Sequence, residues 1–278
     1  MKMQPAVKWS GSKRTQAKEI VKYFPKKIDC YVEPFAGGAT VLCEVLHSDI
    51  KCNAYFCSDL NEDLINLWKR IKSNPEKLID TYRDKWTCLT SFEDVNSKRG
   101  YFEQVRDEYN QHRNPEDFLF LLRTCFNGMP RYNKRGEFNT SYHLTRNGII
   151  PDSLEKILVE WSDMLNKHDV IFECRDYESI LPSKNDFLYL DPPYARTKGM
   201  YFDMFDNERF FKWLQKQECS YALSYDGVSG DLDQTYNVPK NLYDNHIYLK
   251  SGKSSFKRLK DRLNTSYVFE SLYLKNNL

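Results

Sequence analysis

The strongest chemical signal in the sequence is Asp191-Pro192-Pro193-Tyr194, which directly follows the apolar run Phe187–Leu190. Two consecutive prolines fix the backbone and remove two N–H donors, so the turn is stiff and its carbonyls can accept hydrogen bonds. The Asp191 carboxylate and the Pro192 carbonyl therefore form two acceptors at a fixed spacing, which suits the two N–H donors of an exocyclic amine. Tyr194 adds a flat face for a planar base. Pro-Pro alone usually marks only a rigid turn, but the complete motif after an apolar strand favours catalysis.

A second candidate site is Pro34-Phe35-Ala36-Gly37-Gly38, at the end of a strand predicted over residues 29–33. Glycines allow the backbone to approach a ligand at the start of a helix. Without other signals such a pattern is more often a tight strand-to-helix turn, and it is too short to identify a nucleotide. Asp59 follows about twenty residues later, where an acid can bind ribose hydroxyls. Alternatively, Asp59 or Asn61 caps the next helix.

Two basic segments carry aromatic residues. Lys8-Trp9-Ser10-Gly11-Ser12-Lys13-Arg14 opens the chain, and in isolation it is best interpreted as a surface loop. Residues 126–133, Phe-Asn-Gly-Met-Pro-Arg-Tyr-Asn, combine an arginine with amides and aromatics. These side chains suit contacts to base edges and phosphates, and an aromatic ring can wedge into a base stack. The alternative for residues 126–133 is a solvent-facing hairpin.

Length and composition limit the classes of protein to which the chain can belong. The 278 residues, with 41% hydrophobic content and a net charge of +2, can form one core with an insert or two small domains. No apolar run is long enough to span a bilayer, and residues 1–5 lack a signal-peptide core, so we expect no membrane association and a location in the cytosol. The eight cysteines include no Cys-x-x-Cys pair, which predicts reduced thiols and no metal site.

The elements that must position these motifs alternate between strand and helix at both ends of the chain. Such alternation predicts an α/β fold with a mainly parallel sheet covered on both faces, which brings the turns after residues 33, 58 and 190 to one rim. The region between is mostly helical. Strands are expected at 29–33, 53–58, 170–174, Phe187–Leu190, 220–224, 242–249 and 266–274, and helices at Thr40–Leu46, 62–71, 92–111, 115–125, 153–165 and 207–217.

Taken in order, the four motifs resemble those of the Dam-like (α-group, D12 class) adenine-N6 DNA methyltransferases. The resemblance extends over residues 8–274 and implies a Rossmann-like methyltransferase sheet with helices on both faces and a mostly helical target-recognition insert. It assigns residues 1–60 and 166–278 to a catalytic, S-adenosylmethionine-binding domain, and residues 61–165 to a DNA-binding domain. The implied reaction moves a methyl group from S-adenosylmethionine to N6 of an adenine flipped out of duplex DNA, at GATC or another GA-containing site.

The resemblance also implies residue roles. Arg131 corresponds to an arginine that reads a guanine, Phe126 to an aromatic wedge, Lys8 to a lysine that reaches the first base pair, and Asp176 to a residue facing the cofactor's adenine. The implied catalytic residues are Asp191, Pro192, Pro193 and Tyr194; the implied cofactor-binding residues are Trp9, Lys13, Glu33, Pro34, Phe35, Gly37, Gly38, Asp59, Asp176 and Asp191; and the implied DNA-binding residues are Lys8, Phe126, Asn127, Met129, Arg131 and Asn133.

Some positions depart from the family pattern. Ser12 replaces a usual second glycine, Met129-Pro130 replaces a leucine and a variable residue, and residues 141–147 match poorly. These positions lie near the DNA-reading elements, so the sequence leaves the recognition site open.

Alternatives to DNA methylation remain open at this point. The same Asp-Pro-Pro-Tyr chemistry serves amino-methyltransferases that act on RNA or on a protein glutamine, and a nucleic-acid-binding protein with an inactive cofactor site is a further alternative. Cytosine-C5 methylation is disfavoured because the chain has no Pro-Cys nucleophile. The expected partners are double-stranded DNA and a cognate restriction enzyme acting on the same site. We expect a monomer or weak dimer in a bacterial or phage-infected cell.

Overall fold

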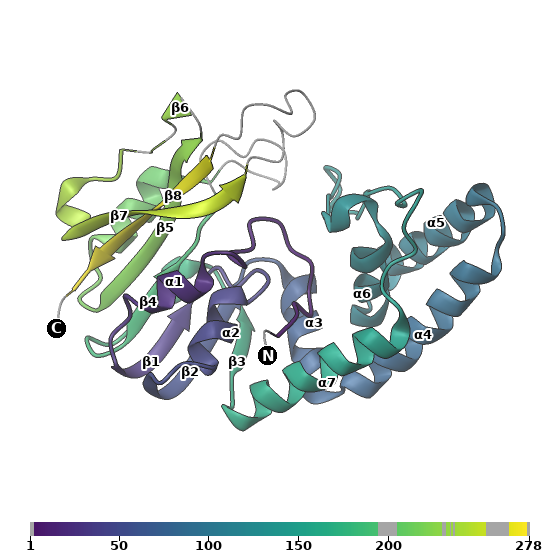
Figure 1. Cartoon of the computed structure of the whole chain (residues 1–278), viewed down its shortest axis with the longest axis horizontal. Helices are drawn as coiled ribbons and strands as arrows, with labels where there is room; N and C mark the ends of the chain where they lie inside the picture. The colour runs from purple at the N-terminus through teal and green to yellow at the C-terminus, as the bar shows by residue number, and fades with distance from the viewer. Residues whose placement is uncertain are drawn as a thin grey trace. The chain divides into compact units, whose positions relative to one another are not determined.

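A computed structural model describes residues 3–193, 205–229, 232–233, 235, 237–253 and 267–276. The described chain forms two compact units, whose elements are labelled in Figure 1. The helical unit comprises residues 3–12 and 61–174. The sheet unit comprises residues 13–60, 175–193 and the described residues from 205 onwards.

The sheet unit is built on a mainly parallel sheet. Its strands run in the order β2-β1-β4-β5-β8-β7, and β6 pairs with β5. The pairs β1–β2, β1–β4 and β4–β5 are parallel, whereas β8 is antiparallel to both β5 and β7. The predicted α/β sheet is therefore confirmed, with an antiparallel edge added by the end of the chain. The strands are β1 (Lys27–Glu33), β2 (Lys51–Asp59), β4 (Phe187–Leu190), β5 (Ser220–Ser229), β6 (Leu232–Asp233), β7 (Asn245–Lys253) and β8 (Tyr267–Lys275).

The central strand β4 is apolar on both faces. All four of its residues are buried, as expected for a strand with helices on both sides of the sheet. Phe187 and Tyr189 pack against Phe24, with ring centroids 4.6 and 5.9 Å away. Leu188 and Leu190 point the other way, into a core that contains residues of α8. The alternation of side chains along the strand thus supplies both cores from four residues.

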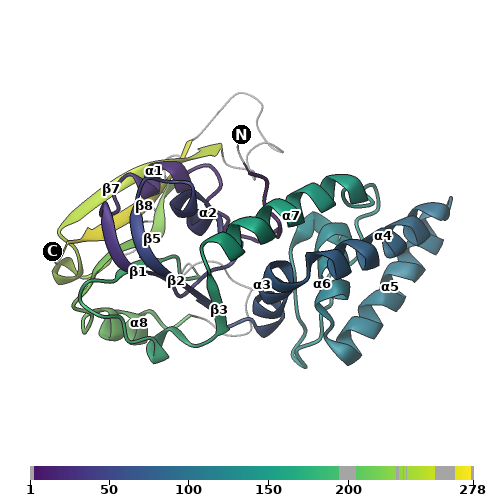
Figure 2. The same ribbon diagram turned by 90° about the horizontal axis from the view of Figure 1, so that it is seen from below.

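The helices of this unit cover the two faces of the sheet. Figure 2 shows α1 (Ala17–Val21) and α2 (Thr40–Leu46) on the face opposite α8 (Asn207–Leu214). Asp206 precedes α8 and caps it, because its side chain accepts a hydrogen bond from the Arg209 N–H at 3.0 Å. Short 3-10 turns η2 (Tyr177–Ser179) and η3 (Lys240–Leu242) complete the unit.

The helical unit is organised around α6, whose sequence is apolar enough to be buried on every side. Residues 116–124 of this helix are all buried. Its two buried acids are paired: Glu116 with Arg70 at 3.1 Å, and Asp117 with Lys85 at 3.2 Å. The elements of the unit are α3 (Glu62–Ser73), α4 (Pro75–Ser91), α5 (Val95–His112), α6 (Pro115–Thr124), η1 (Phe126–Gly128), α7 (Pro151–Lys167) and β3 (Ile171–Cys174). None of the helices within the described ranges is both long and apolar enough to cross a membrane.

The N-terminal segment is attached to the helical unit by hydrogen bonds. The buried Arg123 guanidinium donates to the carbonyls of Pro5, at 3.0 Å, and Ala6. The Trp161 indole N–H donates to the Gln4 carbonyl at 2.8 Å. Residues 3–12 and 166–174 cluster with the helical unit, and the assignment of residues 1–60 and 166–278 to a catalytic domain stays a prediction. The local motifs gave no sign of these long-range bonds.

A glycine in β5 offers a test of the packing. Gly227 lies at a register shift between β5 and β8, and a Cβ there would be 2.2 Å from the Phe269 carbonyl oxygen. We expect Gly227→Ala to lower the free energy of unfolding by roughly 1–3 kcal/mol, because backbone must move to admit the methyl group. Urea denaturation followed by circular dichroism measures the change.

Gly100 is the matched control, because a Cβ at this position in α5 would meet nothing within 4 Å. Gly100→Ala should be neutral or should stabilise the chain by roughly 0.5–1 kcal/mol. A Gly227→Ala variant as stable as the wild type would contradict the described contact between β5 and β8.

Candidate active site

Three acidic residues lie at the carboxyl ends of neighbouring parallel strands. Glu33 ends β1, Asp59 ends β2 and Asp191 directly follows β4. Glu33 is paired in register with Cys57 of β2. Because β1, β2 and β4 are parallel, the three turns that follow them lie at one edge of the sheet, as predicted. Open α/β sheets bind ligands at this edge.

The glycine turn holds Asp59 directly. The Gly37 N–H donates to Asp59 Oδ2 at 3.0 Å, and Gly37 has a φ of 47°, in the left-handed region that glycine tolerates best. The helix cap that the sequence assigned to Asp59 or Asn61 belongs to Asn61, whose side chain accepts from the Leu64 N–H at 2.9 Å. Asp59 is thus fixed at the rim by the turn after β1.

The carboxylate of Asp191 is paired with a buried lysine. Lys13 Nζ lies 2.7 Å from Asp191 Oδ1 and 3.4 Å from Glu270 Oε2, and the Lys13 side chain is only 4% exposed. Burial lowers the pKa of Lys13, but the two carboxylates more than offset this effect and leave the pKa above its ordinary value. Lys13 is therefore a permanent cation that orients Asp191. Glu270, on β8, was not among the residues that the sequence motifs indicated.

Glu33 lies on the same rim, and the pKa of its carboxyl group is raised. It is 2% exposed and accepts a hydrogen bond from the Tyr31 hydroxyl at 2.8 Å. Burial is the main cause that raises the pKa of Glu33 to about 8, and the negative charges of Asp191 and Asp59 add to it. These electrostatic effects indicate that the three carboxyl groups are close enough to influence one another. At neutral pH Glu33 is mostly protonated, unlike an exposed glutamate.

An aromatic cluster adjoins the glycine turn. Phe35 packs against Tyr177 at 5.6 Å and against Phe205 at 5.9 Å between ring centroids. Asp176 caps η2 through a bond from the Glu178 N–H at 2.9 Å, and it also pairs with Arg209 at 3.3 Å. Sequence reasoning missed both Tyr177 and Phe205. Tyr177 could have been found as the aromatic neighbour of Asp176, whereas nothing near Phe205 in the sequence indicates its position.

The remaining residues that the sequence assigned to the cofactor and to catalysis differ in burial. Pro34, Gly38 and Pro192 are buried, and Pro193 is half-buried. Trp9, also half-buried, lies in the segment that clusters with the helical unit, so its role toward the cofactor stays a prediction. Tyr194 lies outside the described residues.

The residues assigned to DNA gather around one hairpin of the helical unit. Residues 125–142 double back through isolated bridges between Cys125 and Tyr142 and between Tyr132 and Phe138. Phe126 is 50% exposed. The Lys8 side chain packs against Gly128 of this hairpin. Its Cδ lies only 2.9 Å from the position that a Cβ on Gly128 would occupy.

The exposed side chains of this hairpin differ in what they contact. The Phe126 ring stacks on His143 with centroids 5.6 Å apart. Asn127 is exposed with a φ of 57°, and Met129 is half-buried. Arg131 is exposed, and its guanidinium makes no ion pair within the described ranges. Phe126 and Arg131 are therefore well placed to contact a ligand outside the hairpin.

Asn133 has a structural task in the turn of the hairpin. Its side-chain oxygen accepts from the Arg135 N–H at 2.8 Å and the Glu137 N–H at 3.1 Å, and its amide donates to Glu137 Oε2 at 2.7 Å. These three hydrogen bonds stabilise the turn. The contact of Asn133 with DNA stays a prediction.

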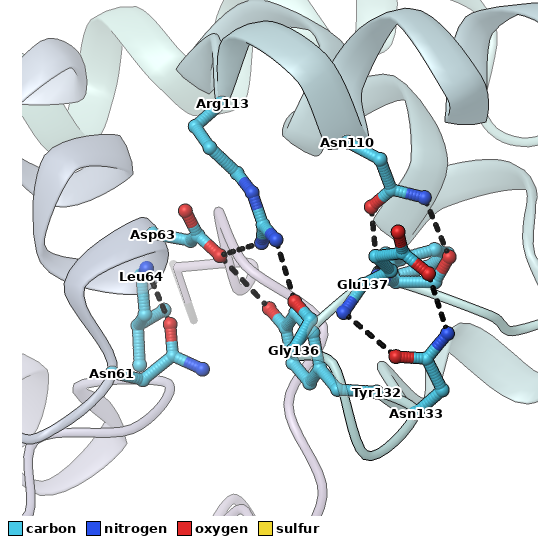
Figure 3. A network of polar contacts seen from close by, with 10 residues as sticks. Asn61, Asp63, Leu64, Asn110, Arg113, Tyr132, Asn133, Gly136 and Glu137 are labelled. Atoms are coloured by element: carbon cyan, nitrogen blue, oxygen red, sulfur yellow. Dashed lines mark hydrogen bonds and ion pairs between the residues drawn. The ribbon is translucent and has the colours of Figure 1, made fainter.

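The hairpin is anchored to helices by the network in Figure 3. Asp63, in the first turn of α3, accepts from Arg113 at 3.1 Å and from the Tyr132 hydroxyl at 3.3 Å. Arg113 also donates to the Gly136 carbonyl at 2.5 Å. Asn110 of α5 forms two bonds with the Phe138 backbone, at 2.7 and 3.0 Å. Helix residues therefore fix the hairpin at both of its strands.

The mainly parallel sheet, with acidic residues at the carboxyl ends of its strands, has the arrangement expected of a Rossmann-like methyltransferase. Residues 9–260 match the model of the D12 class N6 adenine-specific DNA methyltransferases. The chain belongs to this family. The family resemblance expected from the motifs is therefore confirmed.

Relatives in the same family match most of this chain. The Type II methyltransferase M.MjaIII of Methanocaldococcus jannaschii is 30% identical over 91% of this chain and 96% of its own length. The DNA adenine methylase of Haemophilus influenzae is 31% identical over 70% of this chain and 65% of its own. The DNA adenine methylase of Escherichia coli K12 is 30% identical over 68% of this chain and 64% of its own.

Removing the carboxylate of Asp63 should loosen the hairpin. We expect Asp63→Ala to increase hydrogen exchange at the amides of Asn133 and Asn139, which close the hairpin, because Arg113 and Tyr132 lose their shared acceptor. Mass spectrometry of hydrogen–deuterium exchange measures this change. Asp84→Ala, which removes an exposed acid from α4, is the control. Equal protection of residues 131–139 in both variants would show that Asp63 does not anchor the hairpin.

Proposed function

We propose that the chain transfers a methyl group from S-adenosylmethionine to N6 of an adenine flipped out of duplex DNA, within GATC or another GA-containing site. The observation that carries this proposal is the Lys13–Asp191 ion pair, at 2.7 Å, on the rim that also holds Asp59. An oriented carboxylate after β4 can accept a hydrogen bond from the amino group that is to be methylated. Family membership supports the reaction type.

The residues of the rim fit S-adenosylmethionine as the methyl donor. Its sulfonium and amino groups are cations, which suits a rim bearing Asp59 and Asp191. Asp59, fixed by the Gly37 N–H, is placed to accept from ribose hydroxyls. Phe35 and Tyr177 offer apolar faces to the adenine ring, beside the Asp176 carboxylate. When bound, the donor supplies a methyl group whose transfer discharges the sulfonium.

The chain's own contribution to the reaction is to orient the amine. The N6 lone pair of adenine is delocalised into the ring, which makes the amine a poor nucleophile. Hydrogen bonds from its two N–H groups to Asp191 and to the Pro192 carbonyl favour a tetrahedral nitrogen with its lone pair directed at the methyl group. Lys13 keeps the Asp191 carboxylate ionised and fixed in direction. Catalysis of this kind consists of positioning and electrostatics.

The hairpin of the helical unit is the proposed DNA reader. Arg131, exposed on this hairpin, has the bidentate donors that suit a guanine in the major groove. Phe126 is proposed to fill the space left by the flipped adenine, which recovers part of the few kcal/mol that unstacking costs. Lys8, packed beside Gly128, is proposed to reach the first base pair.

We also propose a partner and a cellular setting. M.MjaIII is named a Type II methyltransferase, which supports a cognate restriction enzyme that acts on the same site. We propose a monomer or weak dimer that works in the cytoplasm of a bacterial or phage-infected cell. Tritiated methyl transfer to DNA, RNA and protein pools separates the proposed substrate from RNA and from protein glutamine.

Asp191→Ala tests the proposed mechanism. Methyl transfer should fall at least about 100-fold because the variant loses an acceptor that acts on the reacting amine. Duplex DNA binding should stay within a few-fold of the wild type. Single-turnover methylation and fluorescence anisotropy measure the two properties.

Asp49→Ala is the control for this experiment, since Asp49 is an acid of the sheet unit with a side chain 79% exposed. It should retain wild-type activity. A wild-type methylation rate for Asp191→Ala would rule out the proposed role of the carboxylate.

Arg131→Ala tests base reading. Discrimination between the cognate site and its single-base variants should drop by roughly 1–3 kcal/mol at one position, because a bidentate contact with guanine is lost. Arg135→Ala is the matched control, because Arg135 is exposed on the same hairpin and carries the same charge. Methylation of a panel of site variants measures the preference. If the two variants lose DNA affinity equally and keep the same base preference, Arg131 serves only as a positive charge.

A further inference from the structure

We propose that Glu270 is a positioning residue that shares the Lys13 ammonium with Asp191, and that its carboxylate adds negative charge at the rim, which favours the charged methyl donor over its neutral product. This inference rests on the proposed function. Glu270 lies outside all four sequence motifs.

The geometry places Lys13 between two carboxylates from distant parts of the chain. Its Nζ is 2.7 Å from Asp191 and 3.4 Å from Glu270. Glu270 lies on β8, in register with Leu249 of β7. The Leu249 carbonyl in turn accepts from the Gln16 side-chain amide at 3.3 Å, so the segment after Lys13 is attached to the same edge of the sheet. β8 thus holds its carboxylate against Lys13.

The charges of these groups give Glu270 a function beyond packing. Lys13 and Asp191 as an isolated pair would be neutral, and a neutral pair attracts a sulfonium weakly. The Glu270 carboxylate adds a second negative charge beside the same ammonium. Glu33 adds little to this charge near neutral pH, because its pKa is raised to about 8.

The chemistry of the reaction makes this charge useful. Before transfer the sulfonium carries the positive charge, and during transfer the positive charge passes to N6 of the acceptor base. The bond between the methyl carbon and sulfur would break as the bond between N6 and the methyl carbon forms, so the donor would leave as a neutral thioether, and the methylated N6 would then release one proton to water. The Glu270 carboxylate attracts the donor and stabilises the positive charge on N6, while it gives the neutral thioether no such attraction. Glu270 therefore promotes exchange of product for donor.

The test compares binding of S-adenosylmethionine and S-adenosylhomocysteine, which differ by the methyl group and by the charge on sulfur. Isothermal titration calorimetry at low ionic strength, without DNA, gives both dissociation constants. In Glu270→Gln we expect affinity for S-adenosylmethionine to fall about tenfold, with affinity for S-adenosylhomocysteine within about twofold of wild type, as a lost coulombic attraction requires.

Two further variants keep the test interpretable. Glu270→Asp retains the charge and should retain the wild-type ratio of the two dissociation constants, even where both affinities fall. Glu208→Gln removes an exposed acid of α8 and should leave both constants unchanged. Circular dichroism confirms that each variant is folded.

The outcomes separate the inference from the function on which it rests. If Glu270→Gln weakens binding of both molecules by the same factor, Glu270 is a structural residue and the inference is overturned. If the wild-type protein binds neither molecule, the proposed methyl donor is wrong, and the inference falls with it.

Discussion

The ion pair between Lys13 and Asp191 is the interaction on which the candidate site depends. A carboxylate at the end of a buried strand needs a compensating charge, and Lys13, only 4% exposed, supplies it at 2.7 Å. Removing the Lys13 ammonium would leave the carboxylates beside it without this cation, and the loss of one partner of a buried pair costs about 3–5 kcal/mol. The same pair fixes the direction of the carboxylate. The requirements of stability and of catalysis therefore coincide at Asp191.

Rigidity elsewhere serves the same purpose. Asp59 is tied to the glycine turn by the Gly37 N–H, and the hairpin with Arg131 is tied to α3 and α5 through Asp63 and Asn110. In each case a short side chain on a regular element holds a loop that lacks regular structure of its own. Functional loops held on rigid elements lose less entropy when they bind. Each unit thus positions its own candidate residues through its own contacts.

Much of this arrangement could be predicted from local sequence. The bounds Thr40–Leu46 and Phe187–Leu190 agree with the structure, because small-residue and proline turns delimit them sharply. β5 extends to Ser229, five residues beyond its predicted end at 224, since Gly227 allows β8 to approach where the pattern of apolar residues weakens. The short helix α1 was missed altogether. What could not be predicted depends on contacts between distant residues: the bonds from Arg123 to the N-terminal segment, and the approach of Glu270 to Lys13.

A crystal structure of the protein with S-adenosylhomocysteine tests the role of the rim most directly. We expect the ligand to lie along the ends of β1, β2 and β4, with its ribose hydroxyls on the Asp59 carboxylate. Its sulfur should face the rim at Asp191, whose carboxylate still contacts Lys13. A ligand bound elsewhere, or an Asp191 side chain directed away from the sulfur, would contradict the proposed methyl-transfer site.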